Sequence, residues 1–301
     1  MTAPAMKSPS VKGWCPTLMT PMMSGDGLLV RVKPAAARLS ADAARAIADA
    51  ARRFGNGAID LTNRGNLQSR GLSEGSVEPF AAVVLDHGLA DPDPEAEAVR
   101  NVLCDPLGAD DPSARFDSHA LARKLDAMLV AEPKYRALPD KFGLLVDAGG
   151  QFGLGGVSAD ILVRGGEVSF ALALDGADVV AKVPPAEVFD AVARLLAVFL
   201  SYRDAADPPR RMRSLVADIG AATVFAEAGL VGRQRHDIRN AVAATPDPIG
   251  FKAIAESGRG VVGVGATFGQ VDVPGLDTLA DLASRFGDGT LRVPLYSLHP
   301  S

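Results

Sequence analysis

The fold assignment starts from residues 61–68, with the sequence LTNRGNLQ. This stretch follows a short strand pattern at residues 58–61, so its polar side chains are predicted to lie at a strand end. The guanidinium of Arg64 offers five fixed donors to a carboxylate, and Asn66 and Gln68 add amide groups at alternate positions. The pattern predicts an anion-binding rim, and the alternative for Arg64 is a solvated surface residue.

A small α+β module is predicted around this stretch, over residues 25–90. Residues 28–33 alternate as a strand that carries its two cations on one face. Ser40 is the predicted N-cap of a helix with apolar residues at helical spacing, and a second helix is predicted at residues 77–87. Residues 1–24 form a lead rich in Pro, Met and Thr, which either packs on a neighbour or lies beside a substrate.

The central part of the chain, residues 95–245, is predicted to be a second α+β unit. Two strands joined by a Gly-Gly turn are expected to form a hairpin over residues 161–172. Helices are expected at residues 119–131, 185–202 and 212–228. A basic cluster follows and is interpreted as a solvated helix face, with neutralisation of a polyanionic ligand as the alternative. Its members are Arg233, Arg235, His236 and Arg239.

An internal repeat relates the two ends of the chain. Residues 48–57, ADAARRFGNG, recur as residues 280–289, ADLASRFGDG, so that Phe54 matches Phe286 at an offset of 232 residues. The repeat predicts a second half-domain over residues 250–301. At the same offset Arg64 falls on Tyr296, so the second copy lacks the anion-binding arginine.

A Gly-x-Gly-x-x-Gly pattern at residues 258–263 lies inside the second copy. A dinucleotide fingerprint requires a strand before the glycines and a helix directly after them. Here residues 251–256 are predicted to be helical and residues 261–264 to be a strand. The order of elements therefore argues against a nucleotide-binding loop.

Composition limits the classes of function. Lys and Arg number 31 against 36 Asp and Glu, a formal net charge of −5, so no global basic field favours nucleic acid or anionic lipid. Two cysteines, Cys15 and Cys104, are too few for a disulfide framework or a four-thiolate iron–sulfur cluster. Cys104 is interpreted as a buried small hydrophobe. No signal peptide or membrane span is recognised, so a cytoplasmic protein is expected.

Three motifs carry a family resemblance. TNRGNLQ at residues 62–68 resembles the T-x-R-x-N-[LF]-Q signature of the sulfite/nitrite reductase superfamily, and RNV at residues 100–102 is similar to its R-N-[VI] pattern. KFG at residues 141–143 matches a Lys-Phe-Lys motif except that Gly143 replaces the second lysine, which argues against sulfite or nitrite reduction. GWCP at residues 13–16 and the sequence after it resemble the precorrin-3B synthase family within this superfamily.

The resemblance implies an α+β fold with two ferredoxin-like half-domain repeats around a sulfite/nitrite-reductase-like central α+β domain. It implies oxidation of precorrin-3A by O₂, with an electron donor and a [4Fe-4S] cluster whose four cysteines, C-x5-C and C-x3-C, have no counterpart in these 301 residues. No catalytic residue is assigned, and sirohaem is not expected. Substrate binding is predicted for six residues, namely Arg64, Asn66, Gln68, Arg100, Asn101 and Lys141.

Alternatives remain open for two of these residues and for the whole chain. Arg100 alternatively pairs with the acidic linker before it, and Lys141 alternatively only flanks a strand. The chain itself is predicted to bind a tetrapyrrole as part of precorrin-3B synthase, with a separate cluster-bearing chain as a partner. The other two readings are a non-catalytic tetrapyrrole-binding protein and a sirohaem-dependent reductase relative.

Overall fold

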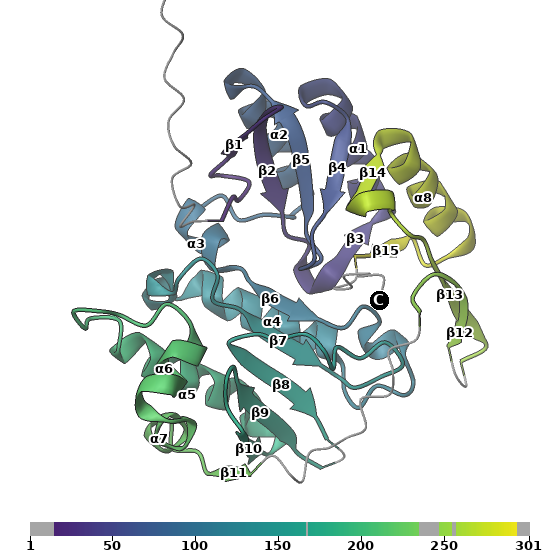
Figure 1. The fold of residues 1–301 in the computed structure, drawn as a ribbon. Helices are drawn as coiled ribbons and strands as arrows, with labels where there is room; N and C mark the ends of the chain where they lie inside the picture. Colours follow the sequence, from purple (N-terminus) through teal and green to yellow (C-terminus); the bar gives the residue numbers. More distant parts are fainter. Residues whose placement is uncertain (1–14, 167, 235–246, 255–256, 294–301) are drawn as a thin grey trace, which may run out of the picture.

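The structure is a computed structural model, and it describes residues 15–166, 168–234, 247–254 and 257–293. Two repeats, one from each end of the chain, form one layer, and a central domain forms the second layer beneath them (Figure 1). We call the part from β1 (Met22–Ser24) to α2 (Glu74–Asp86) the N-terminal repeat. The central domain extends from α3 (Pro94–Val99) to β11 (Gly232–Gln234), and the C-terminal repeat from β12 (Gly250–Ile254) to β15 (Thr290–Arg292). Helices combined with one mixed sheet and otherwise antiparallel sheets make this an α+β fold.

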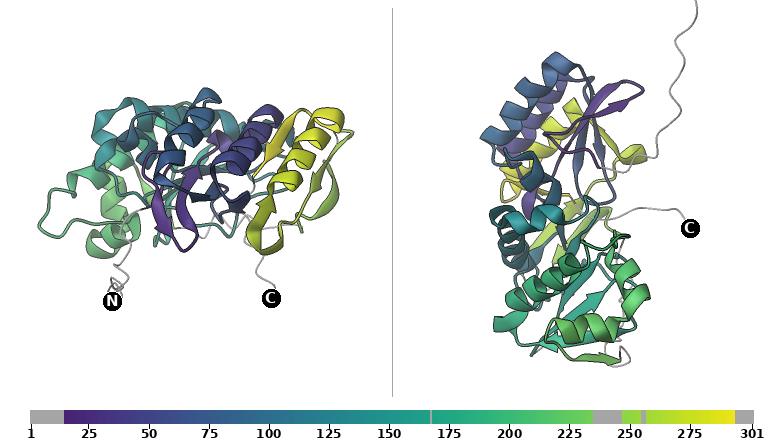
Figure 2. Two further views of the ribbon diagram at one scale, coloured as in Figure 1. Left: turned by 90° about the horizontal axis from the view of Figure 1, so that it is seen from above. Right: turned by 90° about the vertical axis from the view of Figure 1, so that its left-hand side faces the viewer.

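The N-terminal repeat is a five-stranded antiparallel sheet in the order β1-β2-β5-β4-β14, in which β14 comes from the C-terminal repeat. Helices α1 (Ala41–Phe54) and α2 cover one face of this sheet, and α8 (Val273–Phe286) packs beside α1 (Figure 2). Its strands are β1 (Met22–Ser24), β2 (Gly27–Val32), β4 (Ala58–Leu61), β5 (Leu67–Leu72) and β14 (Gln270–Asp272). Its other elements are β3 (Arg38–Ser40), α1 (Ala41–Phe54) and α2 (Glu74–Asp86).

Local sequence signals explain where these helices begin. The side chain of Ser40 accepts a hydrogen bond from the amide of Ala43, which confirms the predicted N-cap of α1. Ser73 and Ser76 form a reciprocal capping box at the start of α2. Apolar residues at helical spacing then bury one stripe of each helix against the sheet.

The central domain is a six-stranded sheet in the order β11-β10-β9-β8-β7-β6. Strands β6, β7 and β8 run parallel, and the predicted β8–β9 hairpin is antiparallel as expected. Its strands are β6 (Val102–Cys104), β7 (Leu144–Asp147), β8 (Ile161–Gly165), β9 (Phe170–Leu174), β10 (Val179–Val183) and β11 (Gly232–Gln234). Its helices are α3 (Pro94–Val99), α4 (Ser118–Ala131), α5 (Val188–Ser201), α6 (Met212–Ile219) and α7 (Ala221–Glu227).

Two predicted helices are corrected by the structure. The helix expected at residues 212–228 is interrupted, because Gly220 adopts a φ of 83° and separates α6 from α7. The helix expected at residues 251–256 is a strand, β12 (Gly250–Ile254), paired with β13 (Arg259–Gly263). Alternate residues of β12 face opposite sides of this hairpin, and Ile254 packs against Leu107 and Phe152. This alternation has a period of two residues, as expected of a strand. The glycine pattern therefore lies in a β-hairpin.

The internal repeat is a structural repeat. Helix α8 (Val273–Phe286) matches α1 at the same 232-residue offset, and Ala36 and Phe268, which also match, both adopt left-handed backbone conformations. Strand β14 pairs with β4, while β15 (Thr290–Arg292) pairs with β3. These two pairings are equivalent under exchange of the copies, so each repeat completes a sheet of the other.

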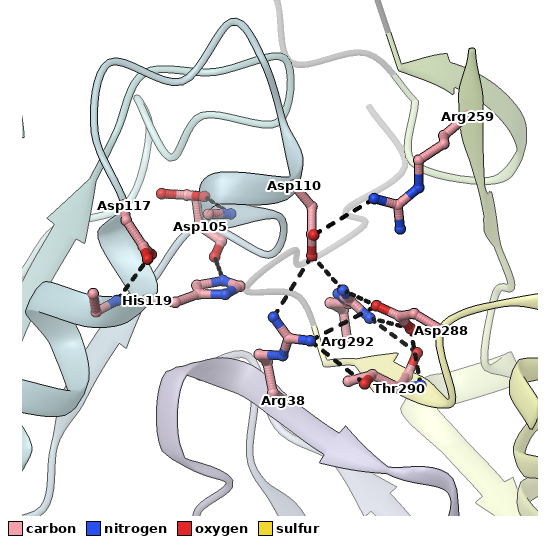
Figure 3. A network of polar contacts seen from close by, with 11 residues as sticks. Arg38, Asp105, Asp110, Asp117, His119, Arg259, Asp288, Thr290 and Arg292 are labelled. Carbon is pink, nitrogen blue, oxygen red and sulfur yellow. Dashed lines mark hydrogen bonds and ion pairs between the residues drawn. The ribbon is translucent and has the colours of Figure 1, made fainter. Parts of the chain in front are cut away.

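A charged hub joins the three parts of the molecule. Asp110 of the central domain pairs with Arg38 from β3, Arg259 from β13 and Arg292 from β15 (Figure 3). Asp288 accepts further hydrogen bonds from Arg292, at 3.1 and 2.7 Å. Because Asp110 lies between three guanidinium groups from the two repeats, it fixes the central domain against both of them.

Candidate anion-binding site

The polar stretch that opened the sequence analysis is a tight connection between β4 and β5. The hydroxyl of Thr62 accepts hydrogen bonds from the amides of Arg64 and Asn66, at 3.3 and 3.1 Å. The amide of Thr62 donates to the carbonyl of Asn66, and Gly65 takes a φ of 67° that closes the turn. The threonine of the motif therefore shapes the loop, and the loop presents Arg64 toward the central domain.

Arg64 has an unusual environment for an arginine. Its side chain is half-buried, and no hydrogen bond or ion pair joins its guanidinium to any residue that the structure describes. Burial lowers the pKa of Arg64, and the neighbouring charge of Arg211 lowers it further. A partly desolvated cation without a carboxylate partner is costly, so this position favours a bound anion.

Arg31 is the second guanidinium at this site. Its Nε and Nη2 atoms donate to the side-chain oxygen of Gln68, at 3.2 and 2.7 Å. The two residues face each other across the β2–β5 pair. Gln68 thus orients Arg31. The sequence pattern placed Arg31 on one face of a strand but did not reveal this contact. Because the amide is neutral, it leaves the charge of Arg31 uncompensated.

Arg211 is the third guanidinium, and Asp160 holds it. The Asp160 carboxylate is fully buried and accepts hydrogen bonds from Arg211 Nε at 3.0 Å, from the Met212 amide at 2.8 Å and from the Gly143 amide at 2.9 Å. Sequence reasoning missed both Arg211 and Asp160. Neither lies in a motif, and folding brings Asp160 to both the start of α6 and the residue before β7.

Gly143 joins these groups. A Cβ atom at this position would lie 3.5 Å from Arg64 Nη1 and 3.4 Å from the carbonyl oxygen of Asn101. The position at which the superfamily motif has its second lysine therefore faces Arg64 directly. Arg31, Arg64 and Arg211 together, which we call the arginine cluster, have Asp160 as their one carboxylate partner within the described part of the chain.

Arg100 and Asn101 have protein partners instead. Arg100 is buried and pairs with Glu97 at 2.8 Å and with Asp126 at 3.0 Å. The side-chain amide of Asn101 donates to the carbonyls of Ala98 and Asp140. Arg100 thus forms ion pairs, but with Glu97 in α3 and Asp126 in α4 and not with the acidic linker at residues 91–95. A role for Arg100 or Asn101 in substrate binding stays a prediction.

Lys33 and Lys141 differ in burial. Lys33 is buried, and its Nζ donates to the carbonyls of Glu97 and Ala98, at 2.8 and 3.2 Å. Burial lowers the pKa of Lys33 to about 8. Lys141 is exposed and flanks β7.

A cavity lies between the N-terminal repeat and the central domain. Its lining includes Lys33, Arg64 and Asn66 from the N-terminal repeat and Arg100, Asn101 and Cys104 from the central domain.

Cys15 and Cys104 do not have the C-x5-C or C-x3-C spacing of the family's cluster ligands. These two cysteines fall short of the four thiolates that the family's cluster requires. Cys104 is buried, and burial raises the pKa of its thiol well above the usual range, which disfavours the thiolate form that binds metal. Within the described ranges, no three His, Cys, Asp or Glu side chains gather in an arrangement that would hold a metal ion.

The basic cluster that follows α7 lies only partly within the described residues. Arg233 lies in β11 and is exposed. Arg235, His236 and Arg239 lie outside the described residues, as does Tyr296, the repeat equivalent of Arg64.

In the portion of the chain that the structure covers, none of the helices combines the length and apolar character needed to span a bilayer.

Comparisons with known proteins place this site in a family context. Residues 20–86 match the family described as "Nitrite/Sulfite reductase ferredoxin-like half domain". A precorrin-3B synthase from a Sinorhizobium species is 39% identical over 153 residues, which cover 51% of this chain and 32% of the relative. The NirA protein of Mycobacterium tuberculosis matches with a TM-score of 0.76 at 22% identity, over 89% of this chain and 52% of that structure.

These matches agree with the fold and the resemblance. The chain has the α+β fold of that structure, and about half of its length is similar to a precorrin-3B synthase. It spans about half of the solved structure and about a third of the curated relative. The matched half-domain contains β4, β5 and the loop that carries Arg64.

Proposed function

We propose that this chain is the tetrapyrrole-binding part of a precorrin-3B synthase-like oxidoreductase of cobalamin biosynthesis. The supporting observation is the half-buried guanidinium of Arg64, which has no hydrogen bond or ion pair among the described residues, lies next to Gly143 and is affected by the nearby charges of Arg211 and Arg31. A precorrin carries several acetate and propionate groups, and each carboxylate that reaches this cluster replaces the water that now solvates it. The curated relative is named for this pathway step.

The residues of the chain bind and orient the ligand in this proposal. Arg64 pairs with one carboxylate, and its planar donors fix the direction of approach. Arg31 and Arg211 are held by Gln68 and Asp160, so they contribute positive charge at set positions and lose little side-chain freedom on binding. Such an array determines which edge of a macrocycle faces the site. In this proposal the cluster that supplies electrons belongs to another polypeptide, because this sequence has two cysteines and the family's cluster needs four.

The test uses uroporphyrin, an octacarboxylate porphyrin, as the probe. We expect saturable binding to the purified chain, followed by fluorescence quenching, with a strong decrease in affinity at high ionic strength. Arg64→Gln should weaken binding by about tenfold to a hundredfold, because a charge-assisted contact contributes about 1.5–3 kcal/mol. Arg53→Gln is the matched control, because Arg53 is an exposed arginine at the end of α1. Equal losses in both variants would contradict the proposed site.

The cysteine count supports a second candidate, a tetrapyrrole-binding protein without redox chemistry. Anaerobic purification and reconstitution, followed by iron and acid-labile sulfide analysis, distinguish the two. A stoichiometric cluster on this chain alone would show that two cysteines suffice, against our expectation. Porphyrin binding without a cluster fits both the substrate-binding part of a synthase and a non-catalytic binder, and turnover after adding a cluster-bearing polypeptide separates those.

A further inference from the structure

The central domain contains a pocket that shares no lining residue with the arginine cluster. Its volume is about 400 Å³, which is in the range of sites for small organic molecules. It is lined by the first half of α4, the start of α5 and the turn that joins β8 to β9. Three phenylalanines and two cationic side chains are among the lining residues, namely Phe116, Phe170, Phe189, Arg115 and Lys124. We call it the phenylalanine pocket.

Two of the phenylalanines form a fixed wall of this pocket. The rings of Phe116 and Phe170 meet edge to face, with their centroids 4.6 Å apart. Phe170 is buried at the start of β9, and Phe116 lies against Gly165 at the end of β8. A Cβ atom at Gly165 would overlap the Phe116 ring, so the glycine permits this close approach. Two neighbouring strands therefore hold an apolar surface in place.

Lys124 lies over the third ring. Its Nζ atom is 4.3 Å from the centroid of the Phe189 ring, a cation–π contact that joins α4 to α5. Within the described ranges, no carboxylate pairs with this ammonium group. The aromatic ring thus orients Lys124 and leaves its positive charge uncompensated.

Arg115 is the second cation of the pocket. Its Nη1 atom donates a hydrogen bond to the carbonyl of Gly165 at 3.0 Å. Among the residues that the structure describes, Arg115 forms no ion pair. The carboxylate of Asp117, two residues further along, accepts a hydrogen bond from the amide of Ala120 at the start of α4. A neutral carbonyl therefore orients Arg115, as a neutral ring orients Lys124.

This combination of rings and cations favours one kind of ligand. Burial of an aromatic body against the phenylalanines contributes hydrophobic free energy. A cation beside apolar walls attracts an anion more strongly than a cation in bulk water, because the local dielectric constant is lower. Both cationic side chains are exposed, so a ligand reaches them from solution. Because contacts already orient both, binding immobilises them at a smaller cost in entropy.

We propose that the phenylalanine pocket binds a small aromatic carboxylate of one or two fused rings. The ring system would lie against Phe170 and Phe189, and the carboxylate would pair with Arg115 and Lys124. This ligand is distinct from the tetrapyrrole proposed above, and its site contains none of the residues assigned to the arginine cluster. Binding at the two sites is therefore tested independently.

The probe is 2-naphthoate, and the neutral 2-naphthamide serves as an analogue of similar shape. Isothermal titration calorimetry on the full chain should show saturable 1:1 binding of 2-naphthoate, with 2-naphthamide at least about tenfold weaker. Intermolecular nuclear Overhauser effects should connect the naphthalene protons to the rings of Phe170 and Phe189. Lys124→Gln should weaken 2-naphthoate binding at least about fivefold, because it removes one of the two charges.

Lys134→Gln is the matched control, since Lys134 is also exposed and its Nζ atom lies 5.0 Å from the centroid of the Tyr135 ring. It should change 2-naphthoate affinity by less than about twofold. Circular dichroism checks that both variants fold. The proposal is overturned if 2-naphthoate does not bind, if 2-naphthamide binds equally well, or if the two lysine variants lose affinity equally. Loss of 2-naphthoate binding in Arg64→Gln would also overturn it, by assigning the ligand to the arginine cluster.

Discussion

Arg64 Nη1 lies 3.5 Å from the position that a Cβ atom at Gly143 would occupy, so residue 143 faces the unpartnered guanidinium of the site. The approach joins a loop of the N-terminal repeat to the residue before β7 of the central domain. An additional charge at residue 143 would therefore act on Arg64 at close range. The substitution of Gly143 for the second lysine of the family motif removes one cation and leaves room beside the arginine cluster.

A carboxylate at residue 143 should stabilise the fold and weaken porphyrin binding, whereas a methyl group there should change little. A methyl group there meets its neighbours at ordinary contact distances, so Gly143→Ala should leave uroporphyrin affinity within about twofold of the original. Gly143→Glu places a carboxylate beside Arg64. It should raise the free energy of unfolding by about 1 kcal/mol and weaken porphyrin binding at least about tenfold. Urea unfolding and fluorescence titration measure both quantities. Tighter porphyrin binding by Gly143→Glu would argue against the arginine cluster as the anion site.

Asp160 should matter for both stability and binding through Arg211. Asp160→Ala leaves two buried backbone amides and a guanidinium without their acceptor, so the free energy of unfolding should fall by about 2–4 kcal/mol. The binding role is tested separately by Arg211→Ala, which should weaken uroporphyrin binding about tenfold.

Arg213→Ala provides the comparison for Arg211→Ala. Arg213 lies in the first turn of α6, which Arg211 precedes as the N-cap, and it is mostly exposed and pairs with Asp175. It should alter uroporphyrin affinity by less than about twofold. If Arg213→Ala weakened binding as much as Arg211→Ala, the effect would reflect general surface charge instead of a positioned cation.

Lys33 should make stability depend on alkaline pH. Burial lowers its folded-state pKa to about 8 from an ordinary value of 10.5, so the buried charge destabilises the folded state fully below about pH 8. As pH rises from about 8 to 10.5, the folded protein loses this proton before the unfolded chain does, and the free energy of unfolding rises. The gain should be about 2–3 kcal/mol relative to Lys33→Met.

Urea unfolding at about pH 7.5, 9 and 10 measures this difference. Comparing wild type with Lys33→Met cancels the titration of other groups, which both proteins share. Lys134→Met, at an exposed lysine, controls for the loss of a lysine as such. Parallel curves for wild type and Lys33→Met across this range would show that the Lys33 proton is not linked to folding.

The sequence predicted the elements whose signals are local. Ser40 and the periodic apolar residues after it fix α1, and the repeated segment around Phe54 and Phe286 predicts that α8 repeats it. The position of Arg64 directly after a strand was predicted, whereas residues 62–66 form a tight turn instead of the expected extended segment. In each case the interactions that decide the conformation lie within a few residues.

The remaining site depends on contacts that no local pattern encodes. Asp160 meets Gly143 and Arg211 through tertiary folding, and Gln68 proved to orient Arg31. The error at residues 251–256 has a related cause. The short apolar run there fits either helix or strand, and its pairing with β13 decides the outcome.

Asp288 should make the hub that joins the repeats sensitive to acid. Hydrogen bonds from Arg292 lower the pKa of Asp288 to about 2 from an ordinary value of 3.8. A carboxyl group with a lowered folded-state pKa contributes stability above its unfolded pKa, and this contribution is lost as pH falls from about 4 to about 2. Because the side chain is 31% exposed, we expect solvent to reduce the contribution to about 1 kcal/mol.

Asp288→Asn should remove this part of the acid dependence, because the amide does not titrate and pairs weakly with Arg292. Urea unfolding at about pH 5 and pH 2.5 should show a smaller decrease for Asp288→Asn than for wild type. Asp281→Asn is the control, since Asp281 pairs with Arg45 on the exposed side of the α1–α8 contact. If Asp281→Asn flattened the acid dependence as much as Asp288→Asn, the acid response would come from the helix contact and not from the hub around Asp110.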